Sequence, residues 1–222
     1  MLNNFSPNML KTYQTCPKKF YYKFVEKINI PQNFTPFEKG QKIHALANYF
    51  LKGVNISRIE SALTFGEALI WNKLLDNNFF KKDCLKTEFS MQIKFNDFWL
   101  GGRIDAVVFE GDNYFILDYK TGAVPKNPQY DFQTMVYFLC LDKYLKNYSE
   151  LSFVYIDLKN DKNFIIKFSQ DLLREYETIL KNTLVKITDD KIYSCTSDIN
   201  SCKFCEYNGI CPKNDISDNV YF

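Results

Sequence analysis

Two aspartates and a lysine are the residues whose types and spacing most directly suggest chemistry. Asp105 lies in GGRIDAVVF, and Asp118 lies thirteen positions later in FILDYKTG, where Lys120 follows it by two positions. Residues two apart on a strand point to the same side, so Asp118 and Lys120 share a face. Paired carboxylates repel each other unless a divalent cation neutralises them, and hard oxygen ligands suit Mg²⁺ or Mn²⁺. Such a centre could activate water against a phosphate, with Lys120 orienting the water and stabilising the developing charge.

Four cysteines form a second candidate centre, split between the two ends of the chain. Cys202, Cys205 and Cys211 lie in SCKFCEYNGICP with C-x2-C-x5-C spacing, and Cys16 lies in YQTCPKKF. A C-x-x-C turn lets two thiolates bind one centre, and three clustered thiolates need a fourth ligand. Four thiolates suit structural zinc or an iron-sulfur cluster, and the spacing leaves both open. Either centre would join the two ends of the chain.

The remaining cysteines and the composition set the cellular context. We expect Cys84, Cys140 and Cys195 to be ordinary buried thiols. The first residues show no secretory signal, so seven cysteines indicate thiolate chemistry with a metal rather than a disulfide framework. No apolar run approaches the roughly 20 residues that span a bilayer. We therefore expect a soluble cytoplasmic protein with no membrane partner.

Charge gives only a local indication of a nucleic-acid partner. The chain carries 28 basic and 26 acidic residues, a net charge of +2. Residues 11–27 are different, because five lysines, including Lys18 and Lys19, alternate there with tyrosines and phenylalanines. These side chains could contact phosphates and stack on bases. An amphipathic helix with a solvated lysine face would give the same pattern.

A strand-rich centre between helical segments must position these residues. Alternating and β-branched residues predict a three-stranded meander at 86–95, 99–109 and 114–119, with further strands at 151–158 and 164–168. Helical spacing predicts helices at 7–26, 37–51, 57–77, 130–145 and 170–187. At 222 residues the chain fits one domain, residues 1–222.

The order of these residues resembles a known nuclease family. Asp105 followed by Asp118-x-Lys120 resembles the D…(D/E)-x-K signature of the PD-(D/E)XK nuclease superfamily, and the GRID…LDYKTG sequence is similar to its RecB-like branch. The residue before Asp105 is Ile104, so the literal proline of the signature is missing, as is common in this branch.

Two further landmarks carry the same resemblance. His44, in KGQKIHALANYF, resembles the histidine that completes the metal site of this branch. Gln133 and Tyr137 match its QxxxY motif and, four positions apart, share one face of a helix. The resemblance implies an α/β, restriction-endonuclease-like core with a mixed central β-sheet flanked by helices. It implies Asp105, Asp118 and Lys120 as catalytic residues, a Mg²⁺ or Mn²⁺ site on His44, Asp105, Asp118 and the Tyr119 carbonyl, and DNA guidance by Gln133 and Tyr137.

The cysteine layout is similar to that of iron-sulfur members of this branch, the fourth CRISPR-associated (Cas) protein family and the nuclease domain of AddB-type helicase-nucleases. This likeness implies a 4Fe-4S cluster on Cys16, Cys202, Cys205 and Cys211. It implies a cluster lobe formed by residues of about 6–30 together with 195–213, where Lys18 and Lys19 could contact DNA.

The resemblance implies a metal-dependent exonuclease that hydrolyses phosphodiester bonds of single-stranded DNA or DNA ends. Two settings stay open: spacer acquisition beside a CRISPR integrase, or recombination and repair, where a helicase must do any unwinding. The chain contains no G-x-x-x-x-G-K-[ST] motif of its own. The alternative is a non-catalytic iron-sulfur subunit that binds DNA or assembles a nuclease or integrase complex.

Overall fold

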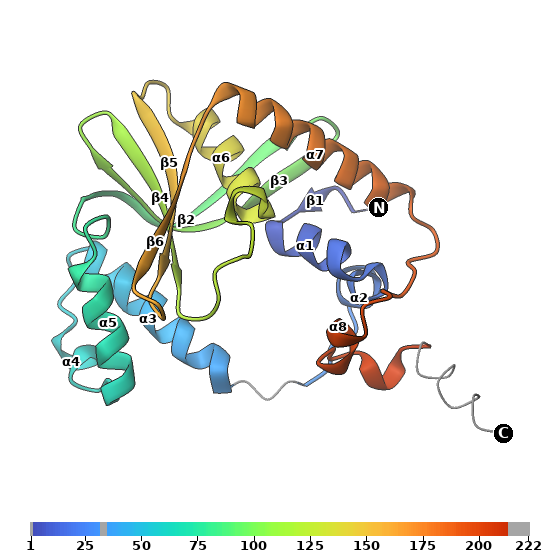
Figure 1. Cartoon of the computed structure of the whole chain (residues 1–222), viewed down its shortest axis with the longest axis horizontal. Helices are drawn as coiled ribbons and strands as arrows, with labels where there is room; N and C mark the ends of the chain where they lie inside the picture. Colours follow the sequence, from blue (N-terminus) through green and yellow to red (C-terminus); the bar gives the residue numbers. More distant parts are fainter. Residues whose placement is uncertain (1, 32–34, 213–222) are drawn as a thin grey trace.

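A six-stranded mixed sheet lies at the centre of the computed structural model, which describes residues 2–31 and 35–212 (Figure 1). The strand order is β1-β3-β4-β5-β6, and β2 pairs with β3. The predicted domain 1–222 and the last residue of the predicted lobe, 213, extend beyond the described residues. The strands are β1 (Asn4–Phe5), β2 (Asp83–Phe95), β3 (Phe98–Glu110), β4 (Asn113–Lys120), β5 (Glu150–Asp157) and β6 (Lys162–Lys167).

The pairing of the strands confirms the predicted meander. Strands β2, β3 and β4 are consecutive and antiparallel. After β4 the chain crosses through helix α6 (Phe132–Tyr144), so β5 returns parallel to β4, and β6 is again antiparallel. The sheet is therefore mixed, as the resemblance implied.

Helices cover both faces of the sheet because both faces are apolar. One core packs α1 (Pro7–Thr15), α6 and α7 (Gln170–Asp189) against the sheet through residues such as Leu10, Phe138 and Leu180. The other core packs α3 (Thr35–Leu51) and α5 (Phe65–Asp76) through Ile43 and Trp71. In the described part of the chain, no helix is both long and apolar enough to cross a membrane.

Two predicted helices are each divided in two. The helix expected at 7–26 ends at Thr15, because Cys16 is extended and Pro17 begins α2 (Pro17–Phe20), which continues as a π-helical turn, Tyr21–Val25. The helix expected at 57–77 becomes α4 (Ser57–Glu60) and α5, because Thr64 begins α5 in a capping box. The first division places Cys16 in a bend between two helices.

The two ends of the chain lie side by side at one end of the molecule, where α8 (Ile199–Lys203) packs near α2 (Figure 1). The backbone N–H of Lys18 donates to the carbonyl of Ser194 at 3.2 Å, and the Tyr207 hydroxyl donates to the carbonyl of Ile28 at 3.0 Å. These hydrogen bonds join segments more than 170 positions apart in the sequence.

Candidate active site

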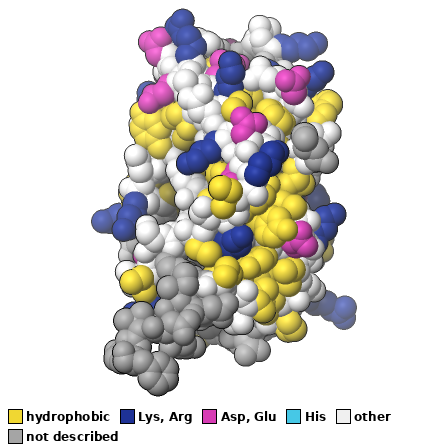
Figure 2. All heavy atoms as spheres, turned by 90° about the vertical axis from the view of Figure 1, so that its right-hand side faces the viewer, with side chains coloured by type: hydrophobic (Ala, Val, Ile, Leu, Met, Phe, Trp, Pro, Cys, Tyr) yellow, Lys and Arg dark blue, Asp and Glu magenta, His cyan; other side chains and the backbone are white. Residues whose placement is uncertain are grey.

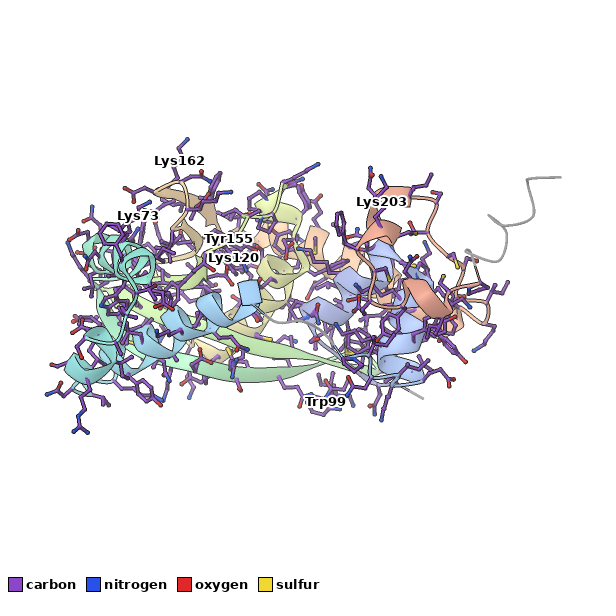
Figure 3. All side chains as sticks on the ribbon, turned by 90° about the horizontal axis from the view of Figure 1, so that it is seen from below. Lys73, Trp99, Lys120, Tyr155, Lys162 and Lys203 are labelled. Carbon is purple, nitrogen blue, oxygen red and sulfur yellow. The ribbon has the colours of Figure 1, made fainter. Side chains whose placement is uncertain are left out.

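Asp118 and Lys120 lie together at the end of β4, as their spacing predicts. Lys120 Nζ lies 2.7 Å from Asp118 Oδ2 and donates to Gln133 Oε1 at 3.2 Å. Gln133, near the start of α6, donates through Nε2 to Asp118 Oδ1. Figure 3 shows Lys120 beside Tyr155 in the middle of the molecule, with Nζ 5.7 Å from the centre of the Tyr155 ring. The side-chain amide of Gln133 thus holds the carboxylate and the ammonium in one arrangement.

His44 and Asp105 meet beside this group. His44 lies on α3, and its Nδ1 is 3.1 Å from Asp105 Oδ1, while its Nε2 is 2.9 Å from the carbonyl oxygen of Tyr119. Asp105 Oδ2 accepts a hydrogen bond from the Tyr119 N–H at 3.0 Å, which ties β3 to β4. The imidazole is therefore enclosed by oxygen atoms of the residues expected to hold a metal.

Glu88 flanks the site in sequence, where it could contact the metal or DNA or hold a surface position on its strand, and the structure places it beside His44 and Asp105. Ligand atoms of His44, Glu88 and Asp105 all lie within 4.8 Å of one another. Glu88 sits on β2 between two residues paired with β3, and its φ of +48° is unusual for a residue with a side chain. Its carboxylate is 2.7 Å from Nε of Arg103. A strained backbone that aims a carboxylate into a charged site is typical of functional positions.

The electrostatics of the site favour a cation. Burial, and next the charge of Asp105, raise the pKa of Asp118 to about 6 against the opposing effects of Lys120 and His44. Burial lowers the pKa of His44, but the carboxylates of Asp105 and Asp118 outweigh it and raise that pKa overall. Three carboxylates and one imidazole thus share a partly buried site, where a bound cation would offset the repulsion between the carboxylates.

These residues fit Mg²⁺ or Mn²⁺. Among the described residues, no donor makes a hydrogen bond to the buried Asp118 Oδ2, although Lys120 Nζ is its ion-pair partner. That oxygen is available as a ligand. Carboxylate oxygens, a backbone carbonyl and one imidazole are the donors that these hard cations accept. His44, Glu88, Asp105, Asp118 and the Tyr119 carbonyl would hold such an ion.

A cleft gives solvent and substrate access to the site. It has a volume of about 730 Å³ and is lined by His44, Glu88, Asp105 and Lys120, among others. A second hollow of about 350 Å³ shares Arg103, Asp105 and Gln133 with the cleft and continues along the start of α1 to Lys11. The two hollows therefore form a path from the carboxylates to α1.

Tyr137 lines the second hollow and supports its floor. The Tyr137 hydroxyl donates to the carbonyl of Arg103 at 2.8 Å. A Cβ at Gly102 would lie 2.8 Å from the Tyr137 ring, so only glycine allows this close approach. Gln133 and Tyr137 share a helix face, as predicted, but in this structure their hydrogen bonds hold Asp118, Lys120 and the β3 backbone.

Five cysteines line one cavity between the two ends of the chain. The cavity has a volume of about 110 Å³ and contains the four predicted cysteines, Cys16, Cys202, Cys205 and Cys211, together with Cys195. The expectation that Cys195 is an ordinary buried thiol is wrong, because its Sγ lies in this cavity, 3.6 Å from that of Cys211. Cys140 is fully buried and Cys84 half-buried.

The cysteine sulfurs of this cavity are not gathered as closely as the ligands of a single bound metal ion. In the described residues, no three cysteine sulfurs lie within 4.8 Å of one another. A tetrahedral zinc site with Zn–S bonds of about 2.3 Å would bring its sulfurs closer than that. Burial, followed by the neighbouring Cys211 and Cys16, raises the pKa of the Cys195 thiol to about 11, so unneutralised thiolates are disfavoured here.

The predicted DNA-contacting lysines lie at this cavity and not in the cleft. Lys19 Nζ is 2.6 Å from Glu206 Oε2, and Lys18 Nζ lies 5.4 Å from the centre of the Tyr21 ring. Lys19 thereby connects the two segments of the lobe, and Lys18 Nζ donates to the carbonyl of Ile192 at 3.3 Å. Figure 2 views the molecule from this side and shows hydrophobic side chains gathered among lysines. Phe204, between two of the cysteines, is 92% exposed.

Comparisons with known proteins identify a family and a similar fold. A model of the PD-(D/E)XK nuclease superfamily matches residues 4–83 and 64–212. The chain is similar to the CRISPR-associated exonuclease Cas4 of Francisella tularensis subsp. novicida (strain U112), with 20% identity over 204 residues, which covers 92% of this chain and 91% of that protein. A solved structure of a candidate exonuclease from Eubacterium rectale has a similar fold, with a TM-score of 0.58 and 13% identity over 93% of this chain and 88% of that one.

Proposed function

Because this chain belongs to the PD-(D/E)XK nuclease superfamily, we propose that it is a Mg²⁺- or Mn²⁺-dependent exonuclease that hydrolyses phosphodiester bonds of single-stranded DNA. The observation that carries the proposal is the arrangement of Asp118 between Lys120 and Gln133, beside the His44, Glu88 and Asp105 group in one cleft. A purely structural role does not require so many partly buried charges, which cost free energy to desolvate.

The acidic residues have a binding role in this mechanism. Asp105, Asp118, Glu88, His44 and the Tyr119 carbonyl would hold the cation. When bound, the cation polarises the phosphate and lowers the pKa of a bound water. The Tyr119 N–H holds Asp105 in place, and Gln133 does the same for Asp118. The ligands are therefore positioned before substrate arrives, which reduces the reorganisation needed during the reaction.

Lys120 acts on the reacting groups. Its ammonium is fixed by Asp118 and Gln133 at the edge of the cleft, with 26% of its side chain exposed. From this position it orients the attacking water and stabilises the negative charge that develops on the phosphate. Arg103, whose side chain is 68% exposed, lines both hollows and is placed to bind a neighbouring phosphate.

We propose that the DNA strand follows the path from the cleft to α1. Tyr137 and Gln133 form part of its floor, and Lys11 lies at its far end. The named exonuclease relative favours attack at DNA ends. Spacer acquisition with a CRISPR integrase and recombination or repair with a helicase are both compatible with this site.

A 4Fe-4S cluster on Cys16, Cys202, Cys205 and Cys211 is the second part of the proposal. The C-x-x-C turn is closed by the Cys205 N–H, which donates to the Cys202 carbonyl at 3.0 Å. Because α1 leads directly from the active-site path to Cys16, a bound cluster would fix α1 and the C-terminal segment together. Its role is then to stabilise the DNA path.

The test uses the anaerobically purified full chain with Mn²⁺ and single-stranded DNA labelled at either the 5′ or the 3′ end. We expect linear DNA to be shortened progressively while a closed circle of the same sequence stays intact, and the released label reports the polarity. Cleavage of the circle would show an endonuclease instead. DNA binding without cleavage in any divalent metal would favour the non-catalytic subunit.

A further inference from the structure

The cavity at the joined chain ends holds one thiol more than a cluster needs. A 4Fe-4S cluster takes four cysteine thiolates, whereas five cysteines line this cavity. If the cluster proposed above is present, one of the five sulfurs is left without an iron. The position of that sulfur decides what it can do.

Cys195 and Cys211 compete for one position. Their sulfurs are 3.6 Å apart. Thiolates bound to different irons of a cubane point outward from separate corners, so two sulfurs in contact face the same corner. Cys211 belongs to the C-x2-C-x5-C run, whereas Cys195 precedes that run by seven positions. The spare thiol is therefore Cys195 when Cys211 is bound.

The segment before Cys195 is held in place by several hydrogen bonds. The Asp190 carboxylate accepts from the backbone N–H groups of Ile192 and Tyr193 at 2.9 and 2.8 Å. Ser194, the residue before Cys195, accepts from the Lys18 N–H of α2. Tyr193 has a φ of +50°, a left-handed conformation that turns the chain. The cysteine is thus directed to the cavity by a fixed loop.

Cys211 is held less firmly by its own segment. It follows a short 3-10 helix, Asn208–Ile210, and its N–H donates to the Asn208 carbonyl at 3.4 Å, which is long for a hydrogen bond. By contrast, the Cys205 N–H closes the C-x-x-C turn, and Cys16 Sγ accepts from the Lys19 N–H at the start of α2. Position 211 is therefore held by a weaker backbone hydrogen bond than position 205, which leaves it open to exchange.

We infer that Cys195 is a reserve ligand of the iron-sulfur cluster, able to replace Cys211 at the same iron. In the exchange, the Cys211–iron bond breaks and a Cys195–iron bond forms. The Cys195 thiol gives its proton to solvent, and the released Cys211 thiolate takes one up, so no electron is transferred. This inference rests on the proposed cluster and adds a ligand outside the four-cysteine pattern.

The experiment compares four anaerobically purified full-length variants: Cys211→Ala, Cys195→Ala, the double variant, and Cys205→Ala. Iron content, visible absorption and the alkylation of each cysteine by iodoacetamide, read by mass spectrometry, are measured on each. Cys84→Ala is the matched control, because Cys84 lies on β2 away from the cavity.

We expect Cys211→Ala to keep its iron, with Cys195 changing from alkylated to protected. Cys195→Ala and Cys84→Ala should match the wild type, and the double variant should lose its iron. Cys205→Ala should also lose its iron, because Cys195 contacts Cys211 and not the C-x-x-C turn. In the wild type, Cys195 should be the cavity cysteine that is alkylated.

Other outcomes overturn the inference. Cys195 is no reserve ligand if Cys211→Ala loses as much iron as the double variant. The same holds if iodoacetamide alkylates Cys195 equally in the wild type and in Cys211→Ala. In both cases the cluster proposal stands. If Cys211 is alkylated in the wild type and Cys195 is protected, then Cys195 is the bound ligand and Cys211 the reserve. This result does not depend on the folding of any variant. A wild type with zinc or no iron overturns the cluster itself.

Discussion

The ammonium nitrogen of Lys120 lies 2.7 Å from Oδ2 of Asp118. The carboxylate is buried, with 3% of the residue exposed, whereas Lys120 reaches the cleft. Because Gln133 is hydrogen-bonded to both groups, neither can turn away from the ion pair without also breaking its hydrogen bond to Gln133. This relationship joins a metal ligand to the residue that faces the reacting phosphate, and it leads to the first two predictions.

Replacing Lys120 by alanine should abolish cleavage and leave the rest of the protein intact. Loss of a positioned charge in an active site typically reduces the rate about 100- to 10,000-fold. The iron content should stay at the wild-type value, because Lys120 lies away from the cysteine cavity. DNA affinity should change little, because Lys120 is one contact at the cleft end of the path and Arg103 and Lys11 remain. Single-turnover cleavage and fluorescence anisotropy measure the two effects separately.

Lys162→Ala is the control for that substitution. Lys162 is an exposed residue on β6, two strands from Lys120 in the sheet, and it does not line the cleft, so its loss should change neither cleavage nor binding. Full activity in Lys120→Ala would show that another group carries the role assigned to Lys120.

Gln133→Ala separates two roles for this glutamine. The amide holds Asp118 and Lys120, so its removal should lower kcat by about 10- to 100-fold, the usual effect of losing a hydrogen bond to a charged group. If Gln133 instead guides the DNA strand, as the QxxxY motif suggests, KM should rise while kcat changes little. Steady-state kinetics on one oligonucleotide length distinguish these results.

The sequence predicted the grouping of Asp105, Asp118 and Lys120 because it depends only on local geometry. Strand alternation alone places Asp118 and Lys120 on one face, and a hairpin brings Asp105 opposite. For Glu88 the sequence leaves both a contact with the metal or DNA and a surface position open, because the direction of its side chain depends on a left-handed φ in β2. Glutamate rarely adopts that conformation, so strand periodicity gives no signal for it.

Glu88→Gly tests the strained carboxylate. Glycine adopts positive φ without strain, so the substitution should raise the free energy of unfolding by up to about 1 kcal/mol. The lost ion pair should subtract little, because Arg103 is largely exposed. Mn²⁺ affinity should nevertheless fall about tenfold or more as one ligand disappears. Denaturant unfolding and calorimetric titration provide the two values.

Asn96→Gly is the matched control for Glu88→Gly. Asn96 has a φ of +52° at the turn between β2 and β3, outside the cleft. It should show a smaller gain in stability, since asparagine tolerates this conformation better, and no change in Mn²⁺ affinity. Equal metal affinity in both variants would remove Glu88 from the metal site.

Metal binding should depend on pH through Asp118 and His44. The pKa of Asp118 is raised to about 6 by burial and Asp105, and that of His44 is raised by the two carboxylates. Ligands must lose their protons to bind a cation, so raised pKa values weaken binding on the acid side. We expect Mn²⁺ affinity to rise at least about tenfold per pH unit as the pH increases toward 6.

Calorimetric titration of Mn²⁺ at several pH values below 6 measures how the affinity changes with pH. His44→Asn should bind more weakly but with a shallower pH dependence, because one titrating ligand is gone. A Mn²⁺ affinity that does not change below pH 6 would mean that Asp118 is not a ligand.

The cysteine cavity contains one cysteine that no sequence pattern identifies. The run at 202–211 identifies three thiols, and proline after Cys16 marks the bend that exposes the fourth. Cys195 follows no recognisable spacing. It reaches the cavity because α7 ends at Asp189 and Asp190 turns the next residues back toward α2, a long-range arrangement that periodicity cannot reveal. The divided first helix was missed for a related reason, since Pro17 begins a helix as well as it ends one.

The most direct measurement is Mn²⁺-dependent shortening of end-labelled single-stranded DNA by the wild type and by Asp118→Asn, with metal binding measured on the same samples. Asparagine keeps the size of the side chain but removes the buried charge. We expect the wild type to shorten the DNA, and the variant to fold, bind DNA and be inactive with weakened Mn²⁺ binding. An Asp118→Asn protein that cleaves at the wild-type rate would contradict the assignment of this cleft as the nuclease active site.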